Sequence, residues 1–309
     1  MDYEHLKIGL PRGLLYARCR VLWRAFFQAL DIETVTSPPT DREILERGTA
    51  LTIDEACLSL KAYLGHVAAL VGRCDYILVP RVSNYGRHRS MCTRFESTPD
   101  LVANVFRGCG QRFLPYDVDV LLKRSEADAF EELGRAVGRP AKEAKRAYRL
   151  AKKAELAHHR ERVQKQEQLL KKEGLKVLIA AHSYVAEDAC MGKTVTGYLK
   201  GAGVVPLRAD LVDRDAALKR SKELSPTCKW EVSREILGGI ALLRDQVDGI
   251  ILLSAFPCGP DAMVNELITR RVKDVPILNL VMDAQSGTAG VETRLESFID
   301  IIRFQKGEL

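Results

Sequence analysis

A cysteine at position 258 stands where a buried strand is predicted to end and a helix to begin. The apolar run at residues 250–253 is typical of a strand inside a parallel sheet. Pro257 and Pro260 restrict the backbone around Cys258, and Asp261 opens a stretch with helical periodicity. Ligands of open α/β sheets collect at the carboxyl ends of strands. Cys258 is therefore either a thiol presented to a ligand or a small residue buried in a turn.

Two further cysteines have comparable surroundings. Asp54 is the predicted N-cap of a helix that runs to about residue 71, which places Cys57 in its first turn. A helix N-terminus stabilises a thiolate, although a packed core cysteine would fit the same pattern. Cys92 lies in the polar, basic loop 81–98, which follows a predicted strand and precedes a helix expected to begin at Pro99.

The spacing of the eight cysteines limits the metal sites that the chain can form. No CxxC motif is present, and the nearest two cysteines are 17 positions apart. A zinc finger or a ferredoxin-type cysteine run is therefore excluded. Any metal site has to gather its ligands from distant loops. The positions are Cys19, Cys57, Cys74, Cys92, Cys109, Cys190, Cys228 and Cys258.

Residues 187–194 end like a phosphate-binding loop, with Gly192, Lys193 and Thr194 after a predicted strand. The first glycine of that motif is replaced by Glu187, and Asp188 follows it. Two carboxylates would repel a phosphate group where backbone amides should hold it. We therefore expect no nucleotide site here, whereas Cys190 within the loop is a candidate auxiliary thiol.

The positive charge of the chain is confined to one segment. The net charge is +6, and residues 141–173 contain eleven Lys or Arg and five Asp or Glu, so 11 − 5 = +6. No nucleic-acid-binding motif accompanies this segment, and a solvated helix face explains it better than a nucleic-acid partner. No apolar run reaches the roughly 20 residues that span a bilayer, and the N-terminus lacks a signal-peptide pattern. We expect a cytoplasmic protein with reduced thiols.

Strand and helix patterns alternate in both halves of the chain. The first half reads β-α-β-α-α-β-α-β, with a capping box predicted at Thr40 and Glu43. Strand signals vanish between residues 121 and 174 and then return. The fold class is therefore α/β: two Rossmann-like domains with mostly parallel sheets, joined by a helical segment. The predicted boundaries are 1–120, 121–174 and 175–309.

Taken together, these motifs resemble those of the 2-hydroxyacyl-CoA dehydratase-type iron–sulfur protein family. The closer resemblance is to acyl-CoA dehydratase activase-related proteins, here without the actin-like ATPase domain. The basic helical insert lies outside the resemblance. The residues that carry it are 8–14, 37–40, 54–57, 75–81, Cys92, Phe95, 99–100, 234–237, 256–261 and 293–296.

The resemblance implies a [4Fe-4S] cluster, or part of a larger iron–sulfur cluster, bound between the two domains. Its ligands would be Cys57, Cys92 and Cys258, which leaves one iron open unless Cys190 or Cys228 occupies it. An actin-like ATP-dependent activator would supply low-potential electrons, which pass to a substrate such as an acyl-CoA thioester or to a partner subunit. The resemblance also implies a homodimer, or a heterodimer with a related iron–sulfur subunit. The alternative is a non-redox scaffold or carrier that binds a metal or cluster.

One segment departs from the family pattern. Residues 283–290 carry Gln285 and Thr288 where ionisable groups are expected, which weakens a proton-transfer role for this stretch. The candidate substrate contacts are instead strand-end positions: residues 87–89, His182, Tyr184 and residues 286–290. No catalytic residue is assigned from the sequence.

Overall fold

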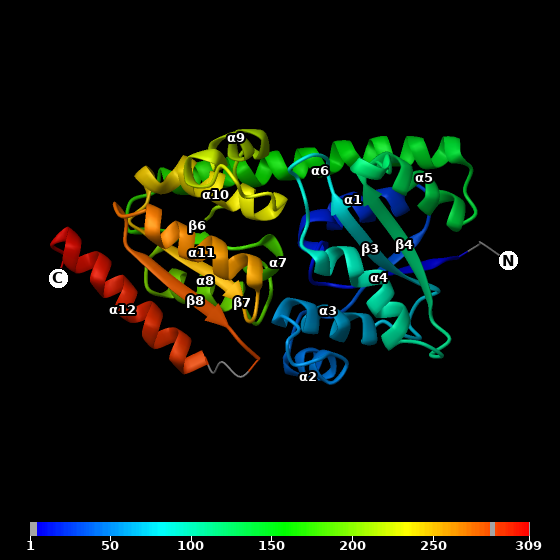
Figure 1. The fold of residues 1–309 in the computed structure, drawn as a ribbon, viewed down its shortest axis with the longest axis horizontal. Coiled ribbons are helices and arrows are strands. Elements are labelled where there is room, and N and C mark those ends of the chain that lie inside the picture. The colour runs from blue at the N-terminus through cyan, green and yellow to red at the C-terminus, as the bar shows by residue number, and fades with distance from the viewer. Residues whose placement is uncertain (1–4, 285–287, 309) are drawn as a thin grey trace. The chain divides into compact units, whose positions relative to one another are not determined.

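The computed structural model describes residues 5–284 and 288–308. The chain forms two compact units, which divide between His159 and Arg160. Each unit contains a four-stranded sheet in which every strand pairing is parallel (Figure 1). The α/β fold class with two Rossmann-like sheets, predicted from the alternating patterns, is confirmed.

The first sheet has the strand order β2-β1-β3-β4. The predicted succession of strands and helices in this half is confirmed. The elements are β1 (Lys7–Leu10), α1 (Tyr16–Gln28), β2 (Glu33–Thr36), α2 (Arg42–Ala50), α3 (Leu58–Ala68), β3 (Tyr76–Asn84), α4 (Thr93–Val105), β4 (Arg112–Asp119) and α5 (Glu126–Ala136).

The second sheet has the order β6-β5-β7-β8, which repeats the first. Its elements are β5 (Lys176–Ala180), α7 (Ser183–Ala186), α8 (Gly192–Gly201), β6 (Val205–Arg208), α9 (Arg214–Leu224), α10 (Glu231–Leu243), β7 (Gly249–Ala255), α11 (Gly259–Arg271), β8 (Ile277–Met282) and α12 (Thr288–Lys306). The helix pair α2–α3 in the first unit therefore corresponds to α9–α10 in the second.

The same polar contact fixes the first strand in both units. Asp75 precedes β3, and its carboxylate accepts a hydrogen bond from the Lys7 amide at 2.8 Å. Asp248 precedes β7, and its carboxylate accepts one from the Lys176 amide at 2.7 Å. Each aspartate also donates its own N–H to the carbonyl of the same lysine. This repeated contact sets the register between the first and third strands of each sheet.

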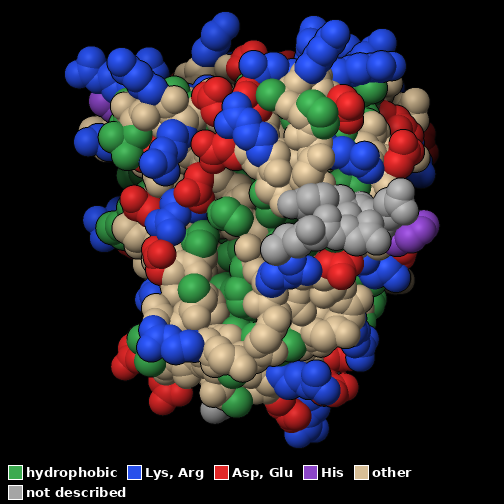
Figure 2. Space-filling model, turned by 90° about the vertical axis from the view of Figure 1, so that its right-hand side faces the viewer, with side chains coloured by type: hydrophobic (Ala, Val, Ile, Leu, Met, Phe, Trp, Pro, Cys, Tyr) green, Lys and Arg blue, Asp and Glu red, His purple; other side chains and the backbone are tan. Residues whose placement is uncertain are grey.

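The helix α6 (Ala141–Leu170) contains the point where the two units divide. In the first unit, the carboxylate of Glu126 binds Tyr148 and Lys152 of α6. In the second unit, Gln166 of α6 hydrogen-bonds to the backbone of Arg208 and Leu211. Figure 2 shows Lys and Arg side chains along the upper edge of the view, where the first part of α6 lies.

One predicted helix cap is wrong. The capping box expected at Thr40 and Glu43 is absent, because α2 begins one residue later than that pattern requires. Asp41 is the N-cap, and its carboxylate accepts a hydrogen bond from the Ile44 amide at 2.9 Å. Thr40 instead uses its hydroxyl in a buried contact with His66.

Candidate functional site

The carboxyl ends of the strands define one edge of each sheet. In both units the first strand lies between the second and the third, so the strand order reverses direction beside the first strand. The crevice beside such a reversal is where open α/β sheets bind ligands. In the first unit it lies between β1 and β3, and in the second between β5 and β7.

Cys57 is the N-cap of α3, with extended backbone at φ −65° and ψ 149°. The helix was predicted to start at Asp54, and that prediction is wrong by a few residues. Residues 53–56 form a turn, closed by the hydrogen bond from the Ala56 amide to the Ile53 carbonyl. Helical bonding starts only with the amides of Leu60 and Lys61, which both donate to the Cys57 carbonyl.

Cys92 is the N-cap of α4, again with extended backbone, at φ −65° and ψ 145°. The helix was expected to begin at Pro99, but it begins before that residue and Pro99 lies inside it. The preceding loop folds back early, because the Met91 amide donates to the Ser83 carbonyl and Ser90 bridges to Asn84. The chain can therefore enter the helix directly after Cys92.

Cys258 is the N-cap of α11, at φ −82° and ψ 108°. Gly259 and Pro260 form the first turn with Asp261, so the helix starts slightly before the predicted opening at Asp261. The Cys258 carbonyl accepts the amide of Ala262. The strand-to-helix turn predicted from the two prolines is present at the carboxyl end of β7.

The three sequence-predicted cysteines thus occupy the same local position, each as the N-cap of a helix of at least eleven residues. Each of these helices leads to the amino end of the next strand, so its N-terminus lies at the carboxyl edge of its sheet. None of the three side chains accepts a capping hydrogen bond from its helix. Each side chain therefore lies at the positive end of a helix dipole, which stabilises a thiolate.

The other five cysteines are placed differently. Cys19 is buried within α1, and Cys109 is exposed in a turn. Burial raises the pKa of Cys74 to about 11 and also raises the pKa of Cys228, which favours the thiol form of both. The Cys190 amide donates to the Asp188 carboxylate in a turn before α8. None of the eight forms a disulfide bond.

In the first unit, a buried histidine links α3 to the segment that follows β2. His66 of α3 is fully buried, and its two ring nitrogens lie 3.1 Å from the Ser37 hydroxyl and 3.0 Å from the Thr40 hydroxyl. Burial lowers the pKa of His66 to about 3, with Arg12 as a secondary cause. His66 is therefore neutral and structural, and it ties α3 to the end of β2.

Two hydroxyl groups on the same face of α3 have no hydrogen-bond partner. Ser59 and Tyr63 are one helical turn apart, are almost fully buried, and are unsatisfied at Oγ and OH respectively. Long side chains on a helix point back toward its N-terminus, which directs Tyr63 toward the turn that carries Ser59. Unpaired buried donors so close to Cys57 are compatible with a group that binds there and accepts their hydrogen bonds.

In the second unit, His182 follows β5 and pairs with the first turn of α11. Its Nε2 lies 2.6 Å from Asp261 Oδ1, and its ring stacks on Tyr184 at 5.1 Å between centroids. Burial lowers the pKa of His182, but the charges of Asp261, Asp210 and Glu235 together raise the pKa by more. His182 and Tyr184 were candidate substrate contacts, and the structure places His182 beside the helix that Cys258 begins.

The loop that resembles a phosphate-binding motif is filled by its own carboxylates. Asp188 accepts hydrogen bonds from the amides of Cys190 and Met191. Glu187 forms ion pairs with Arg162 and Arg208. The amides that would hold a phosphate group are therefore already satisfied by a negative charge.

The remaining candidate substrate contacts are residues 87–89 and the segment 286–290. Residues 87–89 belong to the long loop between β3 and α4, where the Arg89 guanidinium lies over the Tyr85 ring at 5.9 Å. Gln285 and residues 286–287 of the segment 283–290 fall outside the described residues.

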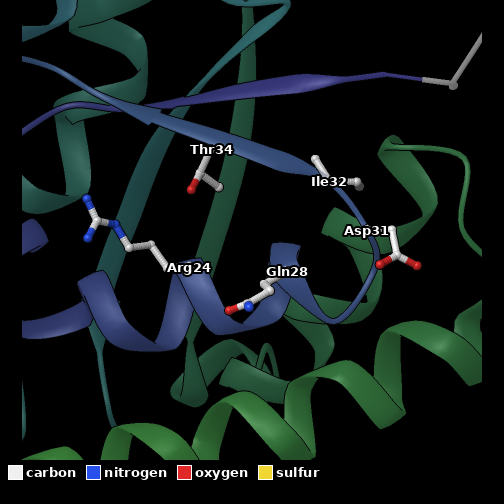
Figure 3. A pocket seen from close by; sticks show the side chains of 5 residues that line it. All are labelled: Arg24, Gln28, Asp31, Ile32 and Thr34. Carbon is white, nitrogen blue, oxygen red and sulfur yellow. The ribbon is translucent and has the colours of Figure 1, made fainter.

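A cavity of about 450 Å³ in the first unit is lined by Arg24, Gln28, Asp31, Ile32 and Thr34 (Figure 3). These residues come from the end of α1 and the start of β2, so the cavity lies toward the amino edge of the sheet. None of the cysteines lines it. It is therefore separate from the cysteine positions.

Within the part of the chain that the structure describes, no three His, Cys, Asp or Glu side chains gather closely enough to hold a metal ion. Cys57 and Cys92 belong to the first unit and Cys258 to the second. Across the same described ranges, none of the helices combines the length and apolar character that a membrane span requires.

Residues 7–212 match the family described as the CoA enzyme activase uncharacterised domain (DUF2229). The chain belongs to this family. The match includes Cys57, Cys92 and the whole of α6, although the resemblance noted from sequence motifs left the basic helical insert out. It ends before α9, so Cys258 and Asp261 lie beyond the matched residues.

Two other comparisons add little to this assignment. No curated protein matches the chain. Among solved structures, a chain titled "Crystal structure of ZnuA" is similar over 97% of this chain and 99% of that one, at 9% identity and a TM-score of 0.29. A similarity at that level carries no argument about function.

Proposed function

We propose that this protein is an iron–sulfur redox component that works with an ATP-dependent activator of a CoA enzyme. Its cluster, of the [4Fe-4S] type, is held by the thiolates of Cys57, Cys92 and Cys258. It receives low-potential electrons from the activator and passes them to a substrate, such as an acyl-CoA thioester, or to a partner subunit. The partner subunit is a second copy or a related iron–sulfur chain.

The observation that carries the proposal is the shared position of the three cysteines as helix N-caps at the carboxyl edges of their sheets. Thiolates there lie at the positive end of a helix dipole, which suits anionic sulfur bound to iron. The family description, which names a CoA enzyme activase, agrees with a role in such a system.

Buried polar atoms without hydrogen-bond partners also support a bound iron–sulfur cluster. The unsatisfied hydroxyls of Ser59 and Tyr63 lie near Cys57. The unsatisfied ring nitrogen of His182 lies beside the helix that Cys258 begins, because the other nitrogen pairs with Asp261. Such buried polar atoms are rare in folded proteins unless a partner is supplied. When bound, an iron–sulfur cluster supplies one-electron transfer at a potential set by burial and by hydrogen bonds to its sulfurs.

Anaerobic reconstitution with iron and sulfide tests the proposal. The wild type is expected to bind about four iron and four sulfide per chain, in keeping with a [4Fe-4S] cluster, and dithionite should bleach its colour. Cys57→Ala, Cys92→Ala and Cys258→Ala should each lose most of the iron. Cys74→Ala is the matched control and should keep it, because the Cys74 thiol packs against Gly9 and donates to the Leu70 carbonyl.

Two outcomes would contradict the assignment. Equal iron content in all four variants would exclude these ligands. Zinc bound in place of iron, with no reducible chromophore, would favour the non-redox alternative, a scaffold or carrier for a metal or cluster. A positive result would next be tested by adding a purified activator and ATP and following reduction of the chromophore.

A further inference from the structure

His182 is a buried polar side chain of the second unit in which one ring nitrogen has no hydrogen-bond partner. The residue is 4% exposed, and it lies at the carboxyl end of β5, beside the crevice between β5 and β7. One ring nitrogen, Nε2, pairs with Asp261 at 2.6 Å. The other, Nδ1, is buried and has no hydrogen-bond partner.

The contact with Asp261 determines which nitrogen carries the proton. A carboxylate accepts hydrogen bonds, so Nε2 must be the N–H that donates to Asp261. In the neutral ring, Nδ1 then carries the unshared electron pair and can only accept. Leaving such an acceptor buried without a donor is unfavourable, and a purely structural histidine would avoid that cost.

The contacts around the ring fix its position and leave Nδ1 without a partner. Tyr184 stacks on the imidazole with an interplanar angle of 24°, which fixes the ring plane. Asp261 lies in the first turn of a thirteen-residue helix and is itself 7% exposed. Two other acidic residues, Asp210 and Glu235, act on His182 through their charge. Ionised carboxylates only accept hydrogen bonds, so neither residue can donate one to Nδ1.

We propose that Nδ1 of His182 accepts a hydrogen bond from a hydroxyl group, of water or of the substrate, that binds at the start of α11. Asp261 is the positioning residue, because it fixes the tautomer and the orientation of the ring. This inference rests on the proposed function, in which Cys258 at the same helix start holds the cluster. It adds the group that recognises the oxygen ligand in the second unit.

Two substitutions separate the nitrogen atoms. Asparagine carries an amide oxygen near the position of Nδ1 but is too short to reach Asp261, whereas glutamine carries an amide nitrogen near Nε2 but no acceptor at Nδ1. If Nδ1 acts on the ligand, His182→Gln should lose iron to a chelator about 10-fold faster than the wild type. His182→Asn should stay within about 2-fold of the wild type, as should the exposed control His5→Gln.

A measurement on the metal-free protein tests the geometry alone. Nitrogen chemical shifts of ¹⁵N-histidine-labelled protein should show His182 with Nε2 protonated and Nδ1 bare, and Asp261→Asn should reduce that preference. A protonated Nδ1 at neutral pH, either in the neutral ring or in a doubly protonated ring, would overturn the inference and leave the proposed function intact.

The reverse pattern of variants would also overturn it. If His182→Asn loses iron quickly while His182→Gln behaves like the wild type, the histidine serves only to hold Asp261. If the wild type binds no iron at all, the proposed function fails and the ligand role of His182 fails with it, whatever the tautomer measurement shows. Equal unfolding temperatures of the two variants would confirm that both are folded.

Discussion

The two units have the same strand order in their sheets but different loops at the carboxyl ends of the strands. In both, an aspartate before the third strand binds the amide that opens the first strand, and a pair of packed helices connects the second strand to the third. The connection after the third strand differs, since it spans residues 85–92 in the first unit and only residues 256–258 in the second. Repeated backbone contacts therefore preserve the scaffold, while the loops at the carboxyl edge are free to differ.

The buried histidines show the same contrast. His66 in the first unit has both ring nitrogens paired with hydroxyls, and its pKa falls to about 3. His182 in the second unit faces a carboxylate, and its pKa is raised. The first histidine fastens two elements, whereas the second keeps an unpaired nitrogen. In the proposed function, the side chains that act at the carboxyl edges are His182 in the second unit and the cysteines in both units.

The largest effect is expected where the helix pairs touch through glycine. A Cβ at Gly65 would lie 2.0 Å from the Ile44 carbonyl oxygen, and one at Gly238 would lie 1.8 Å from the Ala217 carbonyl oxygen. Gly65→Ala and Gly238→Ala should each lower the free energy of unfolding by about 2–3 kcal/mol, because overpacking forces backbone to move. Chemical denaturation measures this.

The matched control is Gly197→Ala, at an exposed position of α8 with open space around it. It should raise the free energy of unfolding by up to about 1 kcal/mol, since alanine favours a helix over glycine. If only one of the two variants, Gly65→Ala or Gly238→Ala, lowers the free energy of unfolding by less than about 1 kcal/mol, the two helix pairs are not packed alike.

The second effect is the pH dependence that His66 imposes. Its pKa is about 3 in the folded protein against 6.5 as the ordinary value, so the unfolded state binds more protons between these values. The contribution of neutral His66 to the free energy of unfolding is therefore fully present above pH 6.5 and is lost progressively as the pH falls toward 3. Between pH 7 and pH 5 the wild type should lose about 2 kcal/mol more than His66→Gln. Parallel losses in the two proteins would refute the assignment.

The third effect compares the two aspartates that fix the first strands. Asp248 also binds the Lys306 ammonium group at 2.7 Å, whereas the contact of Asp75 with Lys7 is exposed. Asp248→Ala should cost about 2 kcal/mol and Asp75→Ala about 1 kcal/mol, from the loss of charge-assisted hydrogen bonds. Urea titrations of both variants would rank them, and the opposite order would contradict the reading of the second contact as the stronger.

The smallest effect is expected at exposed ion pairs on the helices. One solvent-exposed ion pair joins Arg42 to Glu46 in α2, and another joins Arg270 to Glu266 in α11, each across one helical turn. Glu46→Gln and Glu266→Gln should each change the free energy of unfolding by less than about 0.5 kcal/mol, and salt should reduce the change further. A larger loss in either would show that the pair acts in more than a solvated surface contact.

Much of the fold could be predicted because its signals are local. Buried runs such as residues 250–253 indicate parallel strands, and their alternation with helical periodicity gives the α/β class in both halves. The helix starts at Cys57 and Cys92 were misplaced. At Cys57 a short turn delays the helix, and at Cys92 a strand-like bridge between Asn84 and Ser90 advances it. Neither contact leaves a pattern in neighbouring residues.

By itself, the sequence determined which side chains are capable of chemistry, because residue type and strand or helix periodicity are properties of a short stretch. It also excluded compact metal motifs, since ligand spacing along the chain is fixed. Only the tertiary structure decided that helices start directly after Cys57 and Cys92. It also decided that both ring nitrogens of His66 meet hydroxyl groups and that His182 meets Asp261, which is far from it in the chain. Those contacts depend on parallel strands bringing separate loops to one edge, which no local pattern records.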